Sequence, residues 1–147
     1  EEYKVKIPLI AGGGIRTRDD INGLKEAGAD GFQIGSLFVP TTECDAHQNF
    51  KSAYINACDD KIRIIKSPVG MPGRAIETNF LTQGDRIIKK CHKCMPDCNP
   101  KKIPYCISQG LINSVEGRDG LIFSGANLSE VNRMTTVKEV INKLVGQ

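Results

Sequence analysis

No stretch of the 147 residues approaches the roughly 20 consecutive apolar residues of a membrane-spanning helix. The chain also lacks a strong charge imbalance, because Lys and Arg number 20, Asp and Glu number 17, and the formal net charge is +3. So small an excess does not indicate binding to nucleic acid or to a membrane surface. Internal repeats, low-complexity segments and heptad patterns are lacking too. These absences leave a globular protein whose function must be sought in local motifs.

The most informative stretch, residues 7–38, alternates short apolar runs with glycines. Apolar runs at 8–11 and 31–34 each end at small residues, which is typical of short strands followed by tight turns. The apolar residues of the segment between them fall on one helical face: Ile21, Leu24 and Ala27. Gly28 is a helix stop signal. The pattern predicts one βαβ unit with a glycine turn after each strand.

The two turns carry Gly13 and Gly14 after the first strand, and Gly35 and Ser36 after the second. Without Cβ atoms, such a backbone lets a ligand come close to its N–H groups. The start of the following helix adds N–H groups and positive dipole potential, which suit a phosphate. Both turns would emerge at the same end of a parallel sheet, as in the phosphate site of a (β/α)8 barrel. The alternative is a pair of ordinary tight turns.

The rest of the chain shows further elements. Apolar spacing predicts a helix over 50–58 and a short strand over 61–66. Mixed helix with a break at Gly84 is expected over 75–90. Two further helices are predicted over 105–115 and 136–145. In the helix over 105–115 we expect Ile107, Leu111, Ile112 and Val115 to form the apolar face. Thr136 and Glu139 have capping-box spacing. Two prolines and two glycines make 67–74 a shaped loop.

Four of the six cysteines crowd into 16 residues, with the spacing C-x2-C-x3-C-x7-C: Cys91, Cys94, Cys98 and Cys106. Turn residues lie between them, so four sulfurs could converge on one ion. Tetrahedral thiolates suit Zn or an iron–sulfur cluster. The alternative is four structural or redox-active thiols with no metal.

Five segments occur in this order along the chain: IPLIAGGGI, GADGFQIGSLF, ECDAHQNFKSAYINA, KSPVGMPGRAI and GLIFSGAN. Together they resemble the C-terminal part of the nitronate monooxygenase family, formerly called 2-nitropropane dioxygenase. That family includes flavin-dependent enoyl-acyl-carrier-protein reductases. The resemblance implies an FMN-dependent (β/α)8 barrel, and a whole barrel needs roughly 250 residues.

From the resemblance we expect an α/β fold that is a fragment of a TIM barrel. Residues 1–60 would hold the last two βα units with the FMN-phosphate site, and residues 61–147 a mostly helical C-terminal extension with the cysteine cluster. The family implies these FMN-binding positions: Gly13, Gly14, Gln33, Ile34, Gly35 and Ser36. It also implies a cytoplasmic enzyme.

The family's catalytic histidine belongs to a GGH motif upstream of the AGGGI turn, and this chain has no such motif. Its two histidines do not fit: His47 opens a helix, and His92 lies among the cysteines. We therefore assign no catalytic residue and expect the isolated chain to be inactive.

Two polar side chains can each be interpreted in two ways. Arg74 either offers its guanidinium to a phosphate or carboxylate, or ties its loop to backbone carbonyls. Asn127, in place of a family glutamine, either contacts the flavin or substrate, or caps a helix.

The expected function is part of a nitronate monooxygenase that oxidises alkyl nitronates with O2. One alternative is part of an FMN-dependent NAD(P)H enoyl-acyl-carrier-protein reductase, and KSPVGMPGRAI favours the nitronate branch. Another is a non-catalytic, metal-stapled α/β module. We expect a small-molecule substrate, no nucleic acid, no membrane, and self-association through exposed sheet edges.

Overall fold

The structure is a computed structural model, and it describes residues 7–83, 88, 91, 93–96, 98–126 and 128–146. Within these residues the elements follow the chain in this order: β1 (Ile10–Gly12), α1 (Arg18–Glu26), β2 (Gly31–Gln33), the 3-10 helix η1 (Ser36–Phe38), α2 (Gln48–Ile55), the 3-10 helix η2 (Asp59–Lys61), β3 (Ile62–Ile65), β4 (Gly73–Ile76), α3 (Asn79–Thr82), α4 (Ile107–Val115) and α5 (Val137–Val145).

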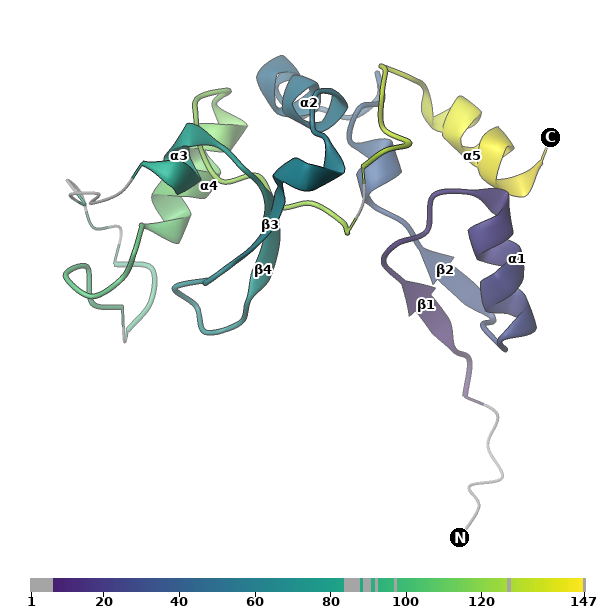
Figure 1. Cartoon of the computed structure of the whole chain (residues 1–147), viewed down its shortest axis with the longest axis horizontal. Helices are drawn as coiled ribbons and strands as arrows, with labels where there is room; N and C mark the ends of the chain where they lie inside the picture. The colour runs from purple at the N-terminus through teal and green to yellow at the C-terminus, as the bar shows by residue number, and fades with distance from the viewer. Residues whose placement is uncertain are drawn as a thin grey trace, which may run out of the picture.

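The predicted βαβ unit is present at one end of the molecule (Figure 1). Strand β1 pairs in parallel with β2, with Ile10 opposite Gly31 and Gly12 opposite Gln33. Helix α1 begins at a capping box, in which Thr17 accepts the Asp20 N–H and the Asp20 carboxylate accepts the Thr17 N–H. The chain leaves the helix through Gly28 at φ 101°, a conformation that glycine adopts without penalty.

The C-terminal helix α5 returns to this first unit and packs beside α1 (Figure 1). The predicted capping box of Thr136 and Glu139 is present at its start. A parallel bridge joins Thr41 to Thr135, and the Thr42 N–H donates to the Thr135 carbonyl at 2.9 Å. One apolar core therefore contains residues from both ends of the described chain, among them Ile21, Leu37, Leu128, Val140 and Leu144.

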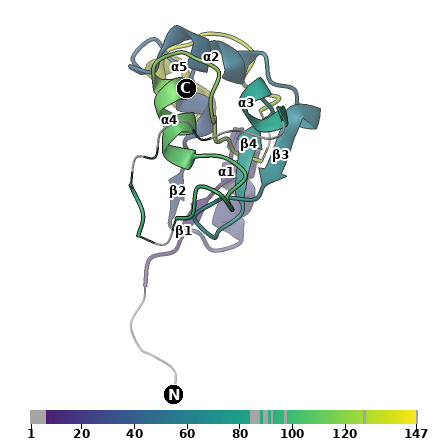
Figure 2. The same ribbon diagram turned by 90° about the vertical axis from the view of Figure 1, so that its left-hand side faces the viewer.

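The other end of the molecule contains the β3–β4 hairpin, α3 and α4, and it faces the viewer in Figure 2. Strands β3 and β4 are antiparallel, with Ile62 opposite Ile76. Phe123 forms an isolated bridge with Ala75, and the Ile76 N–H donates to the Ile122 carbonyl at 2.9 Å. A smaller core sits here around Ala75, Tyr105 and Leu121.

Two predictions for this end were wrong. The shaped loop was expected over 67–74, but Gly73 and Arg74 already belong to β4, because the hairpin continues pairing up to its turn. The mixed helix expected over 75–90 begins as strand, and its described helical part is the single turn of α3. Gly84, where a break was expected, lies outside the described residues.

Helix α4 forms where predicted, and Ile107 of its expected apolar face packs against the smaller core, but most of that face is exposed. Its buried residues are Gly110 and Ser114, whereas Leu111 is 41% exposed and Val115 75% exposed. The reason is close approach: a Cβ on Gly110 would lie 2.8 Å from the Phe80 ring and 2.9 Å from Leu121. The helix thus packs through its small residues, which an apolar-periodicity argument does not detect.

The α/β class is confirmed, with a parallel strand pair connected by helix α1 and further helices after it. The expected division at residue 60 stays a prediction, and the position of α5 against α1 places residues after 128 with the first unit.

Candidate functional site

The glycine turns after β1 and β2 meet at one small cavity of about 60 Å³. The two strands are parallel neighbours, so their carboxyl ends lie side by side and deliver both turns to the same place. All six positions expected to bind FMN line this cavity: Gly13, Gly14, Gln33, Ile34, Gly35 and Ser36. The remaining lining residues are Ile15, Arg16, Leu37, Gly125 and Ala126.

Glycine is required in the first turn for its backbone geometry. Gly13 has φ 89° and Gly14 has φ 74°, in the left-handed region that side chains rarely adopt. Gly35 has an ordinary φ of −120°. A Cβ added at any of the three would meet no atom within 4 Å. These glycines therefore face open space, and a side chain there would occupy it.

The two turns differ in the helix that follows each. Helix η1 begins directly at Ser36, and no side chain caps it. By contrast, the Asp20 carboxylate accepts the N–H groups of Arg16 and Thr17, each at 2.9 Å, and this holds the pKa of Asp20 below its usual value. The Asp20 carboxylate therefore occupies two N–H groups that precede α1, while the Thr17 hydroxyl accepts the Asp20 N–H inside its first turn. The expectation that the start of α1 suits a phosphate stays a prediction.

A third wall of the cavity comes from residues that the sequence did not single out. Gly125 and Ala126 come shortly after Phe123, and Gly125 reaches the cavity from 89 residues beyond Ser36. The Gly125 N–H donates to the Ser36 hydroxyl at 3.2 Å, and a Cβ on Gly125 would lie 2.8 Å from that oxygen. The sequence signal that could have indicated this wall is the run of small residues near the end of GLIFSGAN. Asn127, which follows directly, lies outside the described residues.

Arg74 does not line the cavity. It lies in β4 opposite Ile64, its side chain is exposed, and its carbonyl accepts the Ser124 N–H at 3.0 Å. Within the described part of the chain its guanidinium has no hydrogen bond or ion pair. Neither interpretation of Arg74 gains support.

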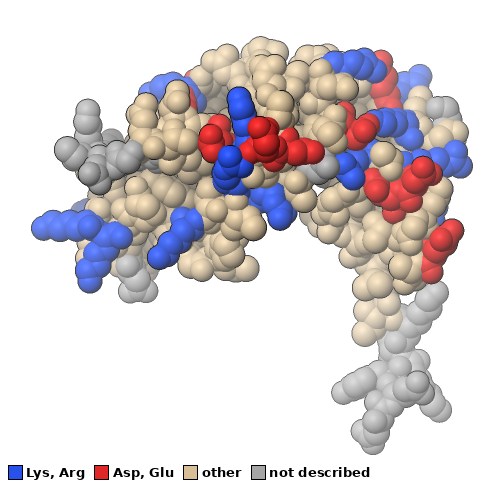
Figure 3. Space-filling model, viewed as in Figure 1, with Lys and Arg blue, Asp and Glu red and all other residues tan. Residues whose placement is uncertain are grey.

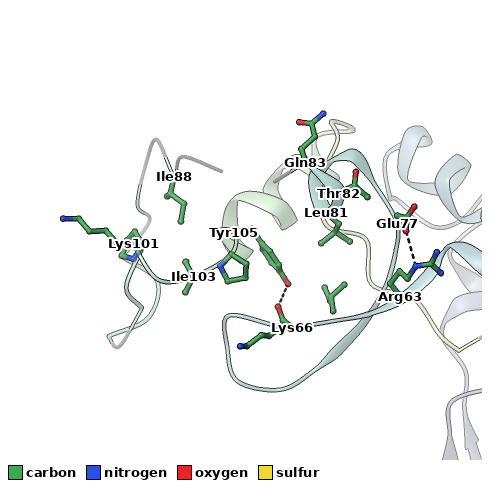
Figure 4. Close-up of a pocket in the computed structure, with 13 residues that line it drawn as sticks. Arg63, Lys66, Glu77, Leu81, Thr82, Gln83, Ile88, Lys101, Ile103 and Tyr105 are labelled. Atoms are coloured by element: carbon green, nitrogen blue, oxygen red, sulfur yellow. Dashed lines mark hydrogen bonds and ion pairs between the residues drawn. The ribbon is translucent and has the colours of Figure 1, made fainter. Parts of the chain in front are cut away.

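A larger hollow of about 1080 Å³ lies at the other end of the molecule, and it shares no lining residue with the glycine cavity (Figure 4). Leu81 and Tyr105 form part of its apolar lining, and the Tyr105 hydroxyl donates to the Lys66 carbonyl at 3.2 Å. At its edge Arg63 pairs with Glu77 at 3.2 Å. This hollow lies beside the hairpin, and none of the predicted FMN-binding residues lines it.

In the part of the chain that the structure describes, the cysteine cluster forms no recognisable metal site. Within the described residues there is no group of three or more His, Cys, Asp or Glu side chains that could hold a metal ion. The Cys94 sulfur accepts a hydrogen bond from the Ser108 hydroxyl at 3.0 Å, and the Cys91 sulfur accepts the Lys93 N–H at 3.4 Å. The expectation of Zn or an iron–sulfur cluster at Cys91, Cys94, Cys98 and Cys106 thus gains no support. Partial burial, and then the neighbouring thiols, raise the pKa of Cys98.

One of the two histidines is described by the structure. His47 is the N-cap of α2, and its Nδ1 accepts the Asn49 N–H at 3.1 Å. Its expected role in opening this helix is confirmed. His92 lies outside the described residues.

Charged side chains of both signs are scattered over the visible face of the molecule, most of which belongs to other residues (Figure 3). Lys and Arg side chains gather at the end opposite the βαβ unit, where Lys93, Lys101 and Lys102 are exposed. Among the described residues, no helix combines the length and apolar character needed to cross a membrane.

The solved structures that resemble this chain confirm its α/β fold, which covers part of each of them. FabK from Thermotoga maritima has a TM-score of 0.76 and 25% identity, over 97% of this chain and 44% of that protein. Nitroalkane oxidase from Streptomyces ansochromogenes has a TM-score of 0.68 and 23% identity, over 97% of this chain and 39% of that protein. These structures are TIM-barrel-type enzymes, and which barrel units this chain supplies stays a prediction.

Curated relatives carry a consistent name. The probable nitronate monooxygenase of Bacillus subtilis is 20% identical over 95% of this chain and 40% of its own length. The putative nitronate monooxygenase of Saccharomyces cerevisiae is 36% identical over 50% of this chain and 18% of its own length. The chain therefore spans well under half the length of either relative. The model of the family described as nitronate monooxygenase matches residues 2–147. The chain belongs to the nitronate monooxygenase family, a family of oxidoreductases.

Proposed function

We propose that the chain forms the FMN-phosphate-binding part of a nitronate monooxygenase, an enzyme that oxidises alkyl nitronates with O2. One observation carries the proposal: in a member of this family, all six residues expected to bind FMN line a single cavity. Both turns approach that cavity with glycines whose missing side chains leave it open.

The cavity fits a phosphate better than a flavin ring. Its volume of about 60 Å³ is far below the roughly 300–1,000 Å³ of pockets that enclose drug-sized ligands. The N–H groups of Gly13, Gly14, Gly35 and Ser36 would hold the phosphate, and the Ser36 hydroxyl would add one more donor. FMN, when bound, supplies the redox chemistry, while these residues bind and orient it. We assign no proton-transfer role to any residue of this chain.

The proposal is tested by comparing FMN with riboflavin, which has the same ring and no phosphate. The chain should bind FMN more tightly in a fluorescence titration. Gly35→Val should weaken FMN binding about tenfold or more, because loss of charge-assisted phosphate contacts of about 1.5–3 kcal/mol corresponds to that change. Gly23→Ala, in the exposed part of α1, is the control and should leave FMN affinity unchanged. Wild-type FMN affinity in Gly35→Val would show that the phosphate is held elsewhere.

The reaction itself requires the whole protein that carries this sequence. We expect O2 consumption with an alkyl nitronate such as propane-2-nitronate. The second candidate is an enoyl-acyl-carrier-protein reductase, which the similarity to FabK favours. In that case the protein would consume NADH or NADPH when given a crotonyl thioester, and nitronate oxidation would be absent.

Self-association remains a proposal about the isolated chain. Strand β1 has only β2 as a partner among the described residues, and Leu9 and Ile10 are 58% and 60% exposed. Open edges with exposed apolar residues favour pairing with another chain. Light scattering across a concentration series measures this, and a monomer at every concentration would contradict it. Cytoplasmic location also stays a prediction.

A further inference from the structure

The glycine cavity has one charged residue in its described lining, Arg16. Every other lining residue is a glycine or an uncharged side chain. A phosphate monoester carries a charge of about −1.5 to −2 at neutral pH. Backbone N–H groups provide only partial positive charges. Arg16 is therefore the one full positive charge in the described lining that could balance a phosphate.

The need for that counter-charge follows from Asp20. Its carboxylate lies at the start of α1, accepts the Arg16 and Thr17 N–H groups, and is held ionised by these bonds, which lower its pKa. An ionised carboxylate beside a phosphate site opposes anion binding and offsets the positive end of the α1 dipole. The first turn therefore offers less positive potential than a glycine turn before an uncapped helix.

The guanidinium of Arg16 lies where it can restore positive potential at the first turn. Its Nε donates to the Gly14 carbonyl at 3.4 Å, so the group lies directly beside the first glycine turn. One terminal nitrogen donates to the Ser129 hydroxyl, also at 3.4 Å. Both distances are long compared with the roughly 2.7–2.9 Å of charge-assisted hydrogen bonds. Neither hydrogen-bond partner is charged, and a guanidinium presents five N–H donors. Backbone hydrogen bonds lower the pKa of Asp20 and the Lys143 hydrogen bond lowers that of Glu130, and the nearby charge of Arg16 lowers the pKa of both carboxyls further.

We propose that Arg16 binds the phosphate of FMN and compensates the Asp20 carboxylate. The guanidinium shifts its weak contacts with Gly14 and Ser129 to the phosphate oxygens, where the hydrogen bonds are charge-assisted. This inference rests on the proposed function, because it adds a residue to the same phosphate site. It concerns binding and makes no claim on the redox reaction.

The test uses the same titrations with FMN and riboflavin on Arg16→Gln, Arg16→Lys and Arg18→Gln. Arg18 is the matched control: it loses the same charge two residues away, but it lies beside Gly146 of the α5 C-terminus and not in the cavity. Arg16→Gln should lower FMN affinity about tenfold, as expected for one lost charge-assisted contact, and leave riboflavin affinity unchanged. Arg16→Lys should retain part of the FMN affinity, because it keeps the positive charge but loses the planar guanidinium that can donate two parallel hydrogen bonds.

Ionic strength gives an independent readout. In the wild-type chain FMN affinity should fall as salt rises, and this dependence should be smaller in Arg16→Gln. A structural role for Arg16 would lower riboflavin affinity to the same extent and leave the salt dependence in place, which would overturn the inference. An equal loss of FMN affinity in Arg18→Gln would also overturn it, since the loss would then reflect the net charge of the chain and not a contact in the cavity.

Failure of this inference is distinguishable from failure of the proposed function. If the wild-type chain prefers FMN over riboflavin and Arg16→Gln does so equally, the phosphate site stands and Arg16 has no part in it. If the wild-type chain shows no preference for FMN, the phosphate site itself is wrong, and the role of Arg16 falls with it. Circular dichroism on each variant confirms that folding is retained, and the Arg16→Lys result decides the question if Arg16→Gln does not fold.

Discussion

Glycine has opposite uses at the two ends of this molecule. In the first region, made of β1, β2, α1 and α5, the glycines at 13, 14 and 35 face open space. In the second region, made of the hairpin, α3 and α4, the glycines at 73, 110 and 120 lie where a side chain would collide. A Cβ on Gly73 would meet the Phe123 ring at 2.5 Å, and a Cβ on Gly120 would meet the Gly110 carbonyl at 2.4 Å. The first set keeps a cavity open, and the second set lets elements pack closely.

The largest expected effect separates these uses. Gly120→Ala should lower the free energy of unfolding by about 3 kcal/mol, because its Cβ would press on the backbone of α4, which has no room to yield. Gly23→Ala should instead raise stability by about 0.5–1 kcal/mol, since that site is exposed, helical and uncrowded. Urea denaturation measures both. A destabilisation below about 0.5 kcal/mol in Gly120→Ala would show that the close packing is not required.

A smaller effect sharpens the comparison inside the first region. Gly14→Ala should cost about 1–2 kcal/mol of stability, because φ 74° is strained for any residue with a Cβ. Gly35→Ala should cost well under 1 kcal/mol, because its φ of −120° is ordinary and no atom lies near the new methyl group. The same urea titrations apply. Equal losses in the two variants would mean that crowding, and not backbone strain, governs both turns.

The smallest expected effect is an acid response that differs between the regions. Hydrogen bonds to neighbouring donors lower the pKa of Asp20 and of Glu139, the capping carboxylates of α1 and α5. Because folding lowers these pKa values, the stabilisation is present above about pH 4.5 and is lost as pH falls through the folded-state pKa values. Helix α4 has no side-chain cap.

Hydrogen exchange, corrected for intrinsic rates, measures this response. Amides of α1 and α5 should lose more protection than those of α4 between pH 6 and pH 3, values that bracket the roughly 4 of ordinary carboxyl groups. A uniform loss across all three helices would indicate that the caps do not act locally.

Much of the candidate site was predictable because its signals are local. The spacing of apolar residues placed the βαβ unit, and the glycines marked both turns. Parallel strand order then brought Gly13 and Ser36 to one cavity without any further information. The third wall at Gly125 was not predictable in the same way, since no periodic pattern links it to Ser36. Asp20 was missed as well, because its role depends on which N–H groups its carboxylate reaches.

The sequence by itself determined elements whose stability comes from neighbours in the chain: the strand–turn–helix–strand order, the capping box of Thr136 and Glu139, and the two glycine turns. Tertiary structure decided which faces are buried, that Gly73 and Arg74 extend a hairpin, and that the C-terminal helix lies against α1. The reason is physical. Turns and caps depend on hydrogen bonds over three or four residues, whereas the α4 face and the third cavity wall depend on close contacts between distant segments. Such contacts leave no periodic trace in the sequence, because the residues that make them are small.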